Sequence, residues 1–118
     1  DIMPTVLQVS KASYPDIFHD GETIYPLSGF SLAPSFTGMS LPAHQYMYWE
    51  HGGNAAIRKG NFKAIHSINN NTWELYDLSV DRAEENDISS KYPQLMEELK
   101  TEWYRWAKAN FVLPKRAK

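Results

Sequence analysis

The sequence predicts an α+β fold: a four-stranded antiparallel sheet packed by a long C-terminal helix, preceded by an N-terminal helix and a long irregular linker. Three observations favour it. Apolar residues alternate with a period of two from about residue 45 to residue 78. Short turns rich in Gly and Asn, "GG", "KGN" and "NNN", divide that region into strands. Apolar residues then recur at helical spacing over roughly residues 92 to 110.

The first 44 residues divide into a helix and a linker. "DIMPTVLQVSKA" predicts a helix of about ten residues with Asp1 as its N-cap and Pro4 in the first turn. Its apolar face, Ile2, Met3 and Val6 among others, requires a partner surface. Residues 13 to 44 scatter Pro, Gly and Ser, so we expect irregular chain with one helical turn near Ser31 to Phe36.

The alternating region predicts a meander. Tyr46 and Tyr48 are expected on one face of the first strand, with Met47 and Trp49 on the other. Gly52-Gly53 permits a tight reversal, and Gly60 is the expected left-handed residue of the second turn. Between the last strand and the helix, four side chains are expected to accept backbone hydrogen bonds: Asp81, Glu84, Asn86 and Asp87.

The C-terminal helix carries one apolar stripe, which we expect to cover one face of the sheet. Its members are Tyr92, Leu95, Met96, Leu99, Trp103, Trp106 and Asn110. The aromatic residues of the strands would then build the core beneath it. An exposed aromatic platform that stacks on sugar rings is the alternative.

Composition excludes several classes of function. With a net charge of −2, the chain has no footprint for a nucleic-acid backbone. It has no cysteine, so a disulfide, a thiolate zinc site and a cysteine nucleophile are excluded from this segment. No apolar run reaches the roughly 18 residues of a membrane span. Neither nucleic acid nor a membrane is therefore an expected partner.

No self-contained active site is predicted. Glu50, His51 and His66 match no zinc spacing. "DLSVDRAEENDI" begins like a calcium loop, but it has Arg82 where Gly is needed and Ile88 where a bidentate Glu is needed. Neither a nucleophile elbow nor a phosphate-binding loop is present. We therefore expect no metal site and no catalytic residue in this chain.

Four segments in order resemble the C-terminal part of type I sulfatases of the arylsulfatase kind. They are "DIMPTVLQVSKA", "YPLSGFSLAPSFTG", "YWEHGGNAAIRKGNFKAI" and "WELYDLSVDRAEENDIS". The likeness extends from Asp1 to about Leu113. The sequence departs from the family pattern in two places. Asn61-Phe62 stands where Asp-Trp is usual and keeps the turn and aromatic chemistry, whereas Ala55, where many relatives carry Arg, lacks a cation that bears on substrate class.

The resemblance implies a longer parent enzyme that hydrolyses sulfate esters. Such enzymes use calcium and a formylglycine made from Cys or Ser in a C/S-x-P-S-R motif. "SLPAH" at Ser40 has Ser-x-Pro without the following Ser-Arg, so that motif is expected upstream. The expected partners are then the missing N-terminal catalytic domain and a sulfated carbohydrate or aryl sulfate. The resemblance also implies a periplasmic or secreted location.

Within this interpretation the chain divides into three parts. Residues 1–44 form the tail of the catalytic domain, residues 45–114 the C-terminal subdomain, and residues 115–118 a disordered tail. The candidates for contact with the substrate cleft are Glu50, His51, Asn54 and Arg58. The alternative is that these side chains only stabilise the turn or the seam between domains.

A stand-alone carbohydrate-binding or protein-interaction module is the second hypothesis. A C/S-x-P-S-R motif a few hundred residues upstream of Asp1 would favour the sulfatase, and its absence would favour the module.

Overall fold

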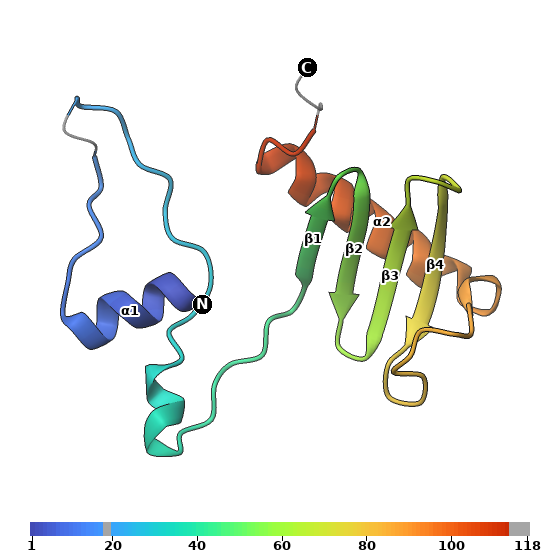
Figure 1. Ribbon diagram of the computed structural model, residues 1–118, viewed down its shortest axis with the longest axis horizontal. Helices are drawn as coiled ribbons and strands as arrows, with labels where there is room; N and C mark the ends of the chain where they lie inside the picture. The colour runs from blue at the N-terminus through green and yellow to red at the C-terminus, as the bar shows by residue number, and fades with distance from the viewer. Residues whose placement is uncertain (18–19, 114–118) are drawn as a thin grey trace. The chain divides into compact units, whose positions relative to one another are not determined.

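The computed structural model describes residues 1–17 and 20–113. The chain forms two compact units, Asp1–His44 and Gln45–Lys118, which are described separately. The predicted α+β class is confirmed, with one four-stranded antiparallel sheet and a helix at each end of the chain (Figure 1). The expected disorder of residues 115–118 concerns residues outside the described ranges. No helix in the described part of the chain is long and apolar enough to cross a membrane.

The first unit contains α1 (Ile2–Ser10) and the 3-10 helix η1 (Ala33–Thr37). Asp1 occupies the predicted N-cap position, although its side chain makes no capping hydrogen bond to α1. Its carboxylate instead accepts hydrogen bonds from the backbone N–H of Phe30, at 2.8 Å, and from His44 Nε2, at 2.8 Å. Tertiary partners that are distant in sequence thus replace the local cap.

Thr5 joins α1 to η1. Its buried hydroxyl donates to the carbonyl oxygen of Asp1 at 2.7 Å and accepts from the N–H of Leu32 at 2.8 Å. The chain passes Asp1 closely at Gly29, whose φ of +90° is disfavoured for any side chain. A Cβ at this position would also collide with the Asp1 carboxylate.

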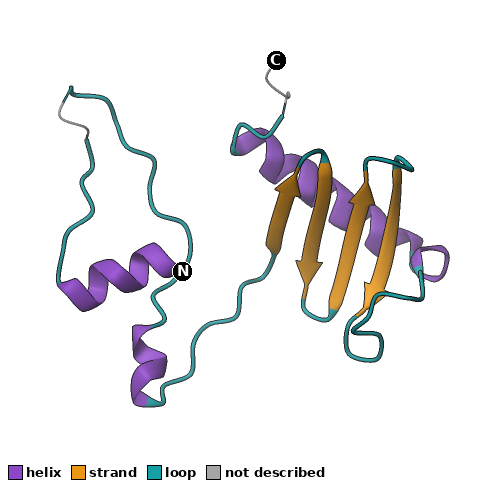
Figure 2. Ribbon diagram, in the orientation of Figure 1, coloured by secondary structure: helices purple, strands orange, loops and turns teal. Residues whose placement is uncertain are grey.

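The second unit is built on the sheet, in the order β1-β2-β3-β4 (Figure 2). The strands are β1 (Met47–His51), β2 (Asn54–Lys59), β3 (Phe62–Ser67) and β4 (Thr72–Asp77). His51 pairs with Asn54, which leaves Gly52 and Gly53 as a two-residue turn with φ of +58° and +93°. Positive φ at both positions matches the right-handed twist of the strands, so the predicted reversal is confirmed.

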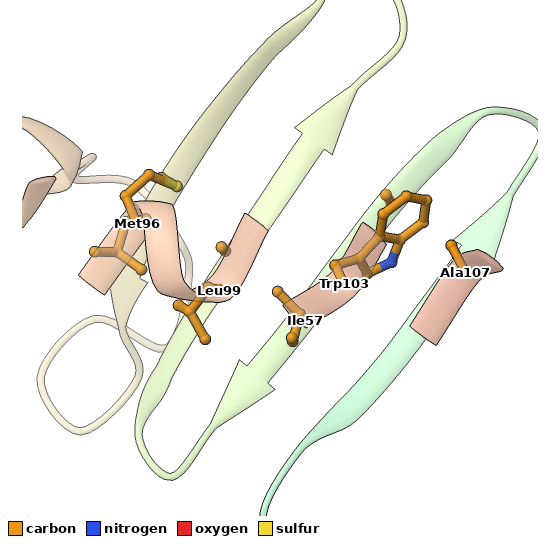
Figure 3. Close-up of a cluster of buried hydrophobic side chains, with 8 residues drawn as sticks. Ile57, Met96, Leu99, Trp103 and Ala107 are labelled. Atoms are coloured by element: carbon orange, nitrogen blue, oxygen red, sulfur yellow. The ribbon is translucent and has the colours of Figure 1, made fainter. Parts of the chain in front are cut away.

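The α2 helix (Pro93–Ala109) follows the short 3-10 helix η2 (Ser89–Lys91) and crosses one face of the sheet (Figure 1). Its side chains meet those of the strands in a buried cluster (Figure 3). Ile57, Leu75 and Leu99 are the largest side chains that are fully buried. Tyr46 and Tyr48 pack against this cluster, whereas Trp49 on the opposite face is 43% exposed.

The ends of the predicted apolar stripe differ from the structure. Tyr92 is 46% exposed at the N-cap, and Asn110 is the exposed C-cap. Ala107, which the stripe left out, is fully buried. Ala107 belongs to the core cluster between α2 and the sheet, and apolar periodicity alone favours the larger Trp106.

The loop between β4 and α2 confirms part of the predicted hydrogen bonding. The Asp81 carboxylate accepts from the N–H groups of Glu85 and Asn86, and Asp87 accepts from the N–H of Leu75 at 3.0 Å. The prediction for Glu84 is wrong, since its carboxylate binds Lys63 Nζ at 2.6 Å. Glu84 has a positive φ of 59°, and this conformation accompanies an ion pair with β3 rather than a local turn contact.

Trp103→Ala should destabilise the second unit by about 3–5 kcal/mol, because it leaves a large cavity in the core. Small domains are stable by only about 5–15 kcal/mol, so the variant should be marginal or unfolded at room temperature. Tyr104→Ala is the matched control, since Tyr104 is 47% exposed and should cost much less. Chemical denaturation of both variants measures the difference, and equal losses would contradict helix-on-sheet packing.

Gly29→Ala should loosen the first unit more than Gly38→Ala does. Both glycines have positive φ, +90° and +81°, so both substitutions carry backbone strain. Only at Gly29 does the new Cβ meet other atoms, those of Asp1. Limited chymotrypsin digestion should therefore cut residues 13–44 faster in the Gly29 variant, and identical cleavage rates would refute the role of this close approach.

Candidate functional site

The turn between β1 and β2 brings together three of the four predicted site residues. Glu50 and His51 end β1, and Asn54 begins β2. We call Glu50–Asn54 the hairpin tip. It combines polar side chains with the exposed backbone of Gly52, an arrangement that suits contact with a ligand.

Two of these side chains are used inside the tip. Glu50 Oε1 accepts from the N–H of Gly53 at 2.9 Å. Asn54 donates to the carbonyl oxygen of His51 at 3.3 Å and accepts from the N–H of Ile68 at 3.1 Å. Asn54 therefore ties the tip to the turn between β3 and β4. These contacts support a stabilising role for Glu50 and Asn54.

His51 differs from its neighbours. Its ring is exposed and makes no hydrogen bond or ion pair with another residue of the described ranges. Both ring nitrogens are thus available to a ligand. Within the tip, His51 is the side chain best placed to contact another molecule.

The structure does not bring Arg58 to the tip. Arg58 lies four residues after Asn54 on β2, about 13 Å away at a strand rise of 3.3 Å per residue. It lines a pocket with Arg82 near the opposite end of the sheet. The sequence did not reveal Arg82 as a neighbour of Arg58. The two residues come together only where the β2–β3 turn meets the loop that follows β4.

No metal site is found in the described part of the chain. His51 pairs with Asn54, and His66 pairs with Ala55 in the core face, so the two histidines lie on opposite faces of the sheet. Across the described ranges, no three His, Cys, Asp or Glu side chains are grouped so that they could hold a metal ion.

Contacts with α2 fix the strand that carries the tip. Trp103 Nε1 donates to the carbonyl oxygen of Trp49 at 3.0 Å. The Tyr48 hydroxyl donates to Glu102 at 2.6 Å, and the Tyr48 ring stacks on Trp106 with centroids 4.9 Å apart. β1 is an edge strand paired with β2 alone, so these contacts with α2 add to the strand pairing that holds it.

The same contacts shift the pKa values of the groups involved. Hydrogen bonds from Arg105 lower the pKa of Glu102, and the Tyr48 hydroxyl lowers it further. Burial and the Glu102 hydrogen bond raise the pKa of Tyr48 well above its ordinary value. Glu102 therefore stays ionised, and Tyr48 stays a neutral donor, throughout the physiological range.

A second set of contacts with α2 lies nearer the start of β1. Glu98 accepts hydrogen bonds from Lys59 Nζ and from the Tyr46 hydroxyl, the latter at 2.9 Å. The Lys59 hydrogen bond, followed by that of Tyr46, lowers the pKa of Glu98. Since the side chains of Lys59 and Glu98 are partly exposed, these contacts position the strand more than they stabilise the fold.

Comparison with known proteins places this architecture among sulfatases. An uncharacterized sulfatase of Schizosaccharomyces pombe is 33% identical over 109 residues, which cover 87% of this chain and 20% of that protein. A putative sulfatase from Bacteroides thetaiotaomicron has the same fold over 100% of this chain and 26% of its own, with a TM-score of 0.73 at 21% identity. No protein-family model matches the chain.

A second similar structure was solved with a bound sugar. This protein, in complex with its substrate D-glucosamine-2-N,6-O-disulfate, matches 99% of this chain with a TM-score of 0.69 at 22% identity. At 21% and 22% identity, these two structures establish the fold alone. The family relationship rests on the 33% identical sulfatase of Schizosaccharomyces pombe.

The four-stranded meander covered by one helix is thus a subdomain within longer proteins of a hydrolase class. The chain belongs to the sulfatases and corresponds to their C-terminal subdomain. It spans about a fifth of the length of the curated relative that it matches.

Glu102→Gln should reduce stability near neutral pH, and the reduction should shrink in acid. The folded-state pKa of Glu102 lies below its unfolded value, so its stabilising contribution is present above the unfolded value and is lost as pH falls through the folded one. The relevant window runs from about pH 5 downward. Thermal melts of wild type and variant between pH 7 and pH 3 measure the gap, and a gap independent of pH would exclude this linkage.

Proposed function

We propose that this chain is the C-terminal subdomain of a sulfuric ester hydrolase, in which it completes the fold and lines part of the substrate cleft. The sulfatase match across 87% of the chain is the observation that carries the proposal. The substrate would be a sulfated carbohydrate or an aryl sulfate, and the chain alone would be inactive. A periplasmic or secreted location agrees with this proposal.

The residues of this chain do not fit the catalytic groups of the family. Calcium requires several oxygen ligands, and the described ranges contain no suitable group of acidic side chains. A formylglycine requires a Cys or Ser in its own motif, and Ser40 lacks the Ser-Arg that should follow. We therefore assign calcium and formylglycine to the rest of the parent protein, and no catalytic step to these residues.

The partner of α1 would be the catalytic domain of the same protein. Four apolar side chains of this short helix are half or more exposed: Ile2 73%, Met3 52%, Val6 52% and Val9 60%. A contiguous apolar face of this kind is characteristic of an interface. Its occupant, we propose, is part of the four-fifths of the relative that this chain does not match.

The hairpin tip would face the substrate cleft, with His51 as the contact residue. The tip is preorganised, since Glu50 and Asn54 already hold the turn. An exposed imidazole on a fixed turn can donate a hydrogen bond to a sugar hydroxyl or to a sulfate oxygen. This role is one of substrate positioning, because the reacting groups lie elsewhere.

His51→Ala in the protein that contains these residues should raise KM for a sulfated substrate several-fold and leave kcat nearly unchanged. His51→Gln keeps a donor and should recover part of the affinity. Steady-state kinetics with an aryl sulfate and with a sulfated monosaccharide provide both parameters.

Lys108→Ala, an exposed change on α2, is the matched control and should leave both parameters unchanged. Kinetic parameters of His51→Ala equal to those of wild type with both substrates would remove the cleft role. The tip would then serve only to stabilise the turn or the interface between domains.

A further inference from the structure

A pocket of about 460 Å³ lies where the β2–β3 turn meets the loop that follows β4. It is lined by Arg58, Asn61, Leu78, Ser79, Arg82 and Glu84. The N–H of Leu78 donates to the carbonyl oxygen of Asn61 at 2.9 Å, which joins the two walls. This volume lies within the range of small-molecule sites, roughly 300–1,000 Å³.

The two arginines give the pocket its positive charge. Arg58 Nε donates to the carbonyl oxygen of Gly60 at 2.7 Å, and this bond fixes the plane of the guanidinium while leaving its two terminal nitrogens unused by it. Arg82 is exposed and has no hydrogen bond or ion pair to any residue within the described ranges. Each guanidinium presents a planar fork of N–H donors that can bind two oxygens of a carboxylate or of a tetrahedral oxyanion.

The one carboxylate that lines the pocket is paired with a lysine rather than with the arginines. Glu84 forms an ion pair with Lys63 at 2.6 Å, so its carboxylate does not neutralise the arginines. Asp77 is engaged by the N–H and the hydroxyl of Ser79, at 2.9 Å and 2.6 Å. The lining thus combines two guanidinium donors with oxygens of Glu84 and Ser79 that can accept from hydroxyl groups.

We infer that this pocket binds a sugar unit that carries an oxyanion, either a sulfate or a carboxylate. The two arginines would bind the charged group. Asn61, Ser79 and Glu84 would hydrogen-bond to hydroxyl groups of the sugar ring, and Leu78 would contact the ring itself. The preference for a sugar over other oxyanions rests on the proposed function. The oxyanion site itself rests only on the residues that line the pocket.

The test is an NMR titration of the 118-residue chain with four probes: glucose 6-sulfate, glucuronate, inorganic sulfate and glucose. Either anionic sugar should shift the amide signals of Asn61, Ser79 and Arg82, and added salt should weaken the effect. Comparison of the two sugars distinguishes a sulfate from a carboxylate as the preferred group. Neutral glucose should leave the signals in place.

Arg82→Gln should weaken binding of the anionic sugar about tenfold or more, the effect of losing a charge-assisted hydrogen bond. Because Arg82 is exposed, the variant should keep the wild-type spectrum elsewhere. Lys108→Gln removes the same charge from α2 and should have no effect on binding.

Three results would overturn the inference: no shift with either anionic sugar, equal binding by wild type and Arg82→Gln, or inorganic sulfate binding as tightly as the sugars. Since the readout is binding at this pocket, its failure is separate from failure of the sulfatase function, which the kinetics of the whole protein test.

Discussion

The structure of the second unit depends on the packing of α2 across one face of the sheet. A four-stranded meander with one uncovered face has few apolar contacts of its own, and α2 supplies the side chains that close its core. Leu99 and Trp103 are buried against Ile57 and Leu75, from β2 and β4. Ala107 is also fully buried in this cluster, so large and small side chains fill the core together.

That packing also determines where the polar residues lie. β1 is an edge strand, and α2 holds it through the Trp103 hydrogen bond to the backbone of Trp49 and the Tyr48–Glu102 contact. The hairpin tip lies at the end of this strand, so the same contacts also fix its position. At the other end of the sheet, the loop that leads into α2 carries Arg82 to the pocket that Arg58 lines. One interface thus supports two separate polar sites.

Local chemistry predicted most of the fold, because strand alternation, Gly-containing turns and helical periodicity all agree along residues 45–110. What the sequence could not show were contacts that depend on tertiary pairing. The Asp1 carboxylate binds Phe30 and His44 rather than the N–H groups of α1, and Glu84 binds Lys63 instead of the loop backbone. The candidate site divided for the same reason: Arg58 follows Asn54 closely in sequence, but an extended strand separates them.

Native-state hydrogen exchange tests the central claim, that α2 and the sheet form one cooperative unit, most directly. The amides of Ile57, Leu75 and Leu99 should exchange only through global unfolding, with the same free energy and the same dependence on denaturant. Exchange of the Leu99 amide at low denaturant while Ile57 and Leu75 remain protected would show that the sheet stands without its helix, and would contradict the account.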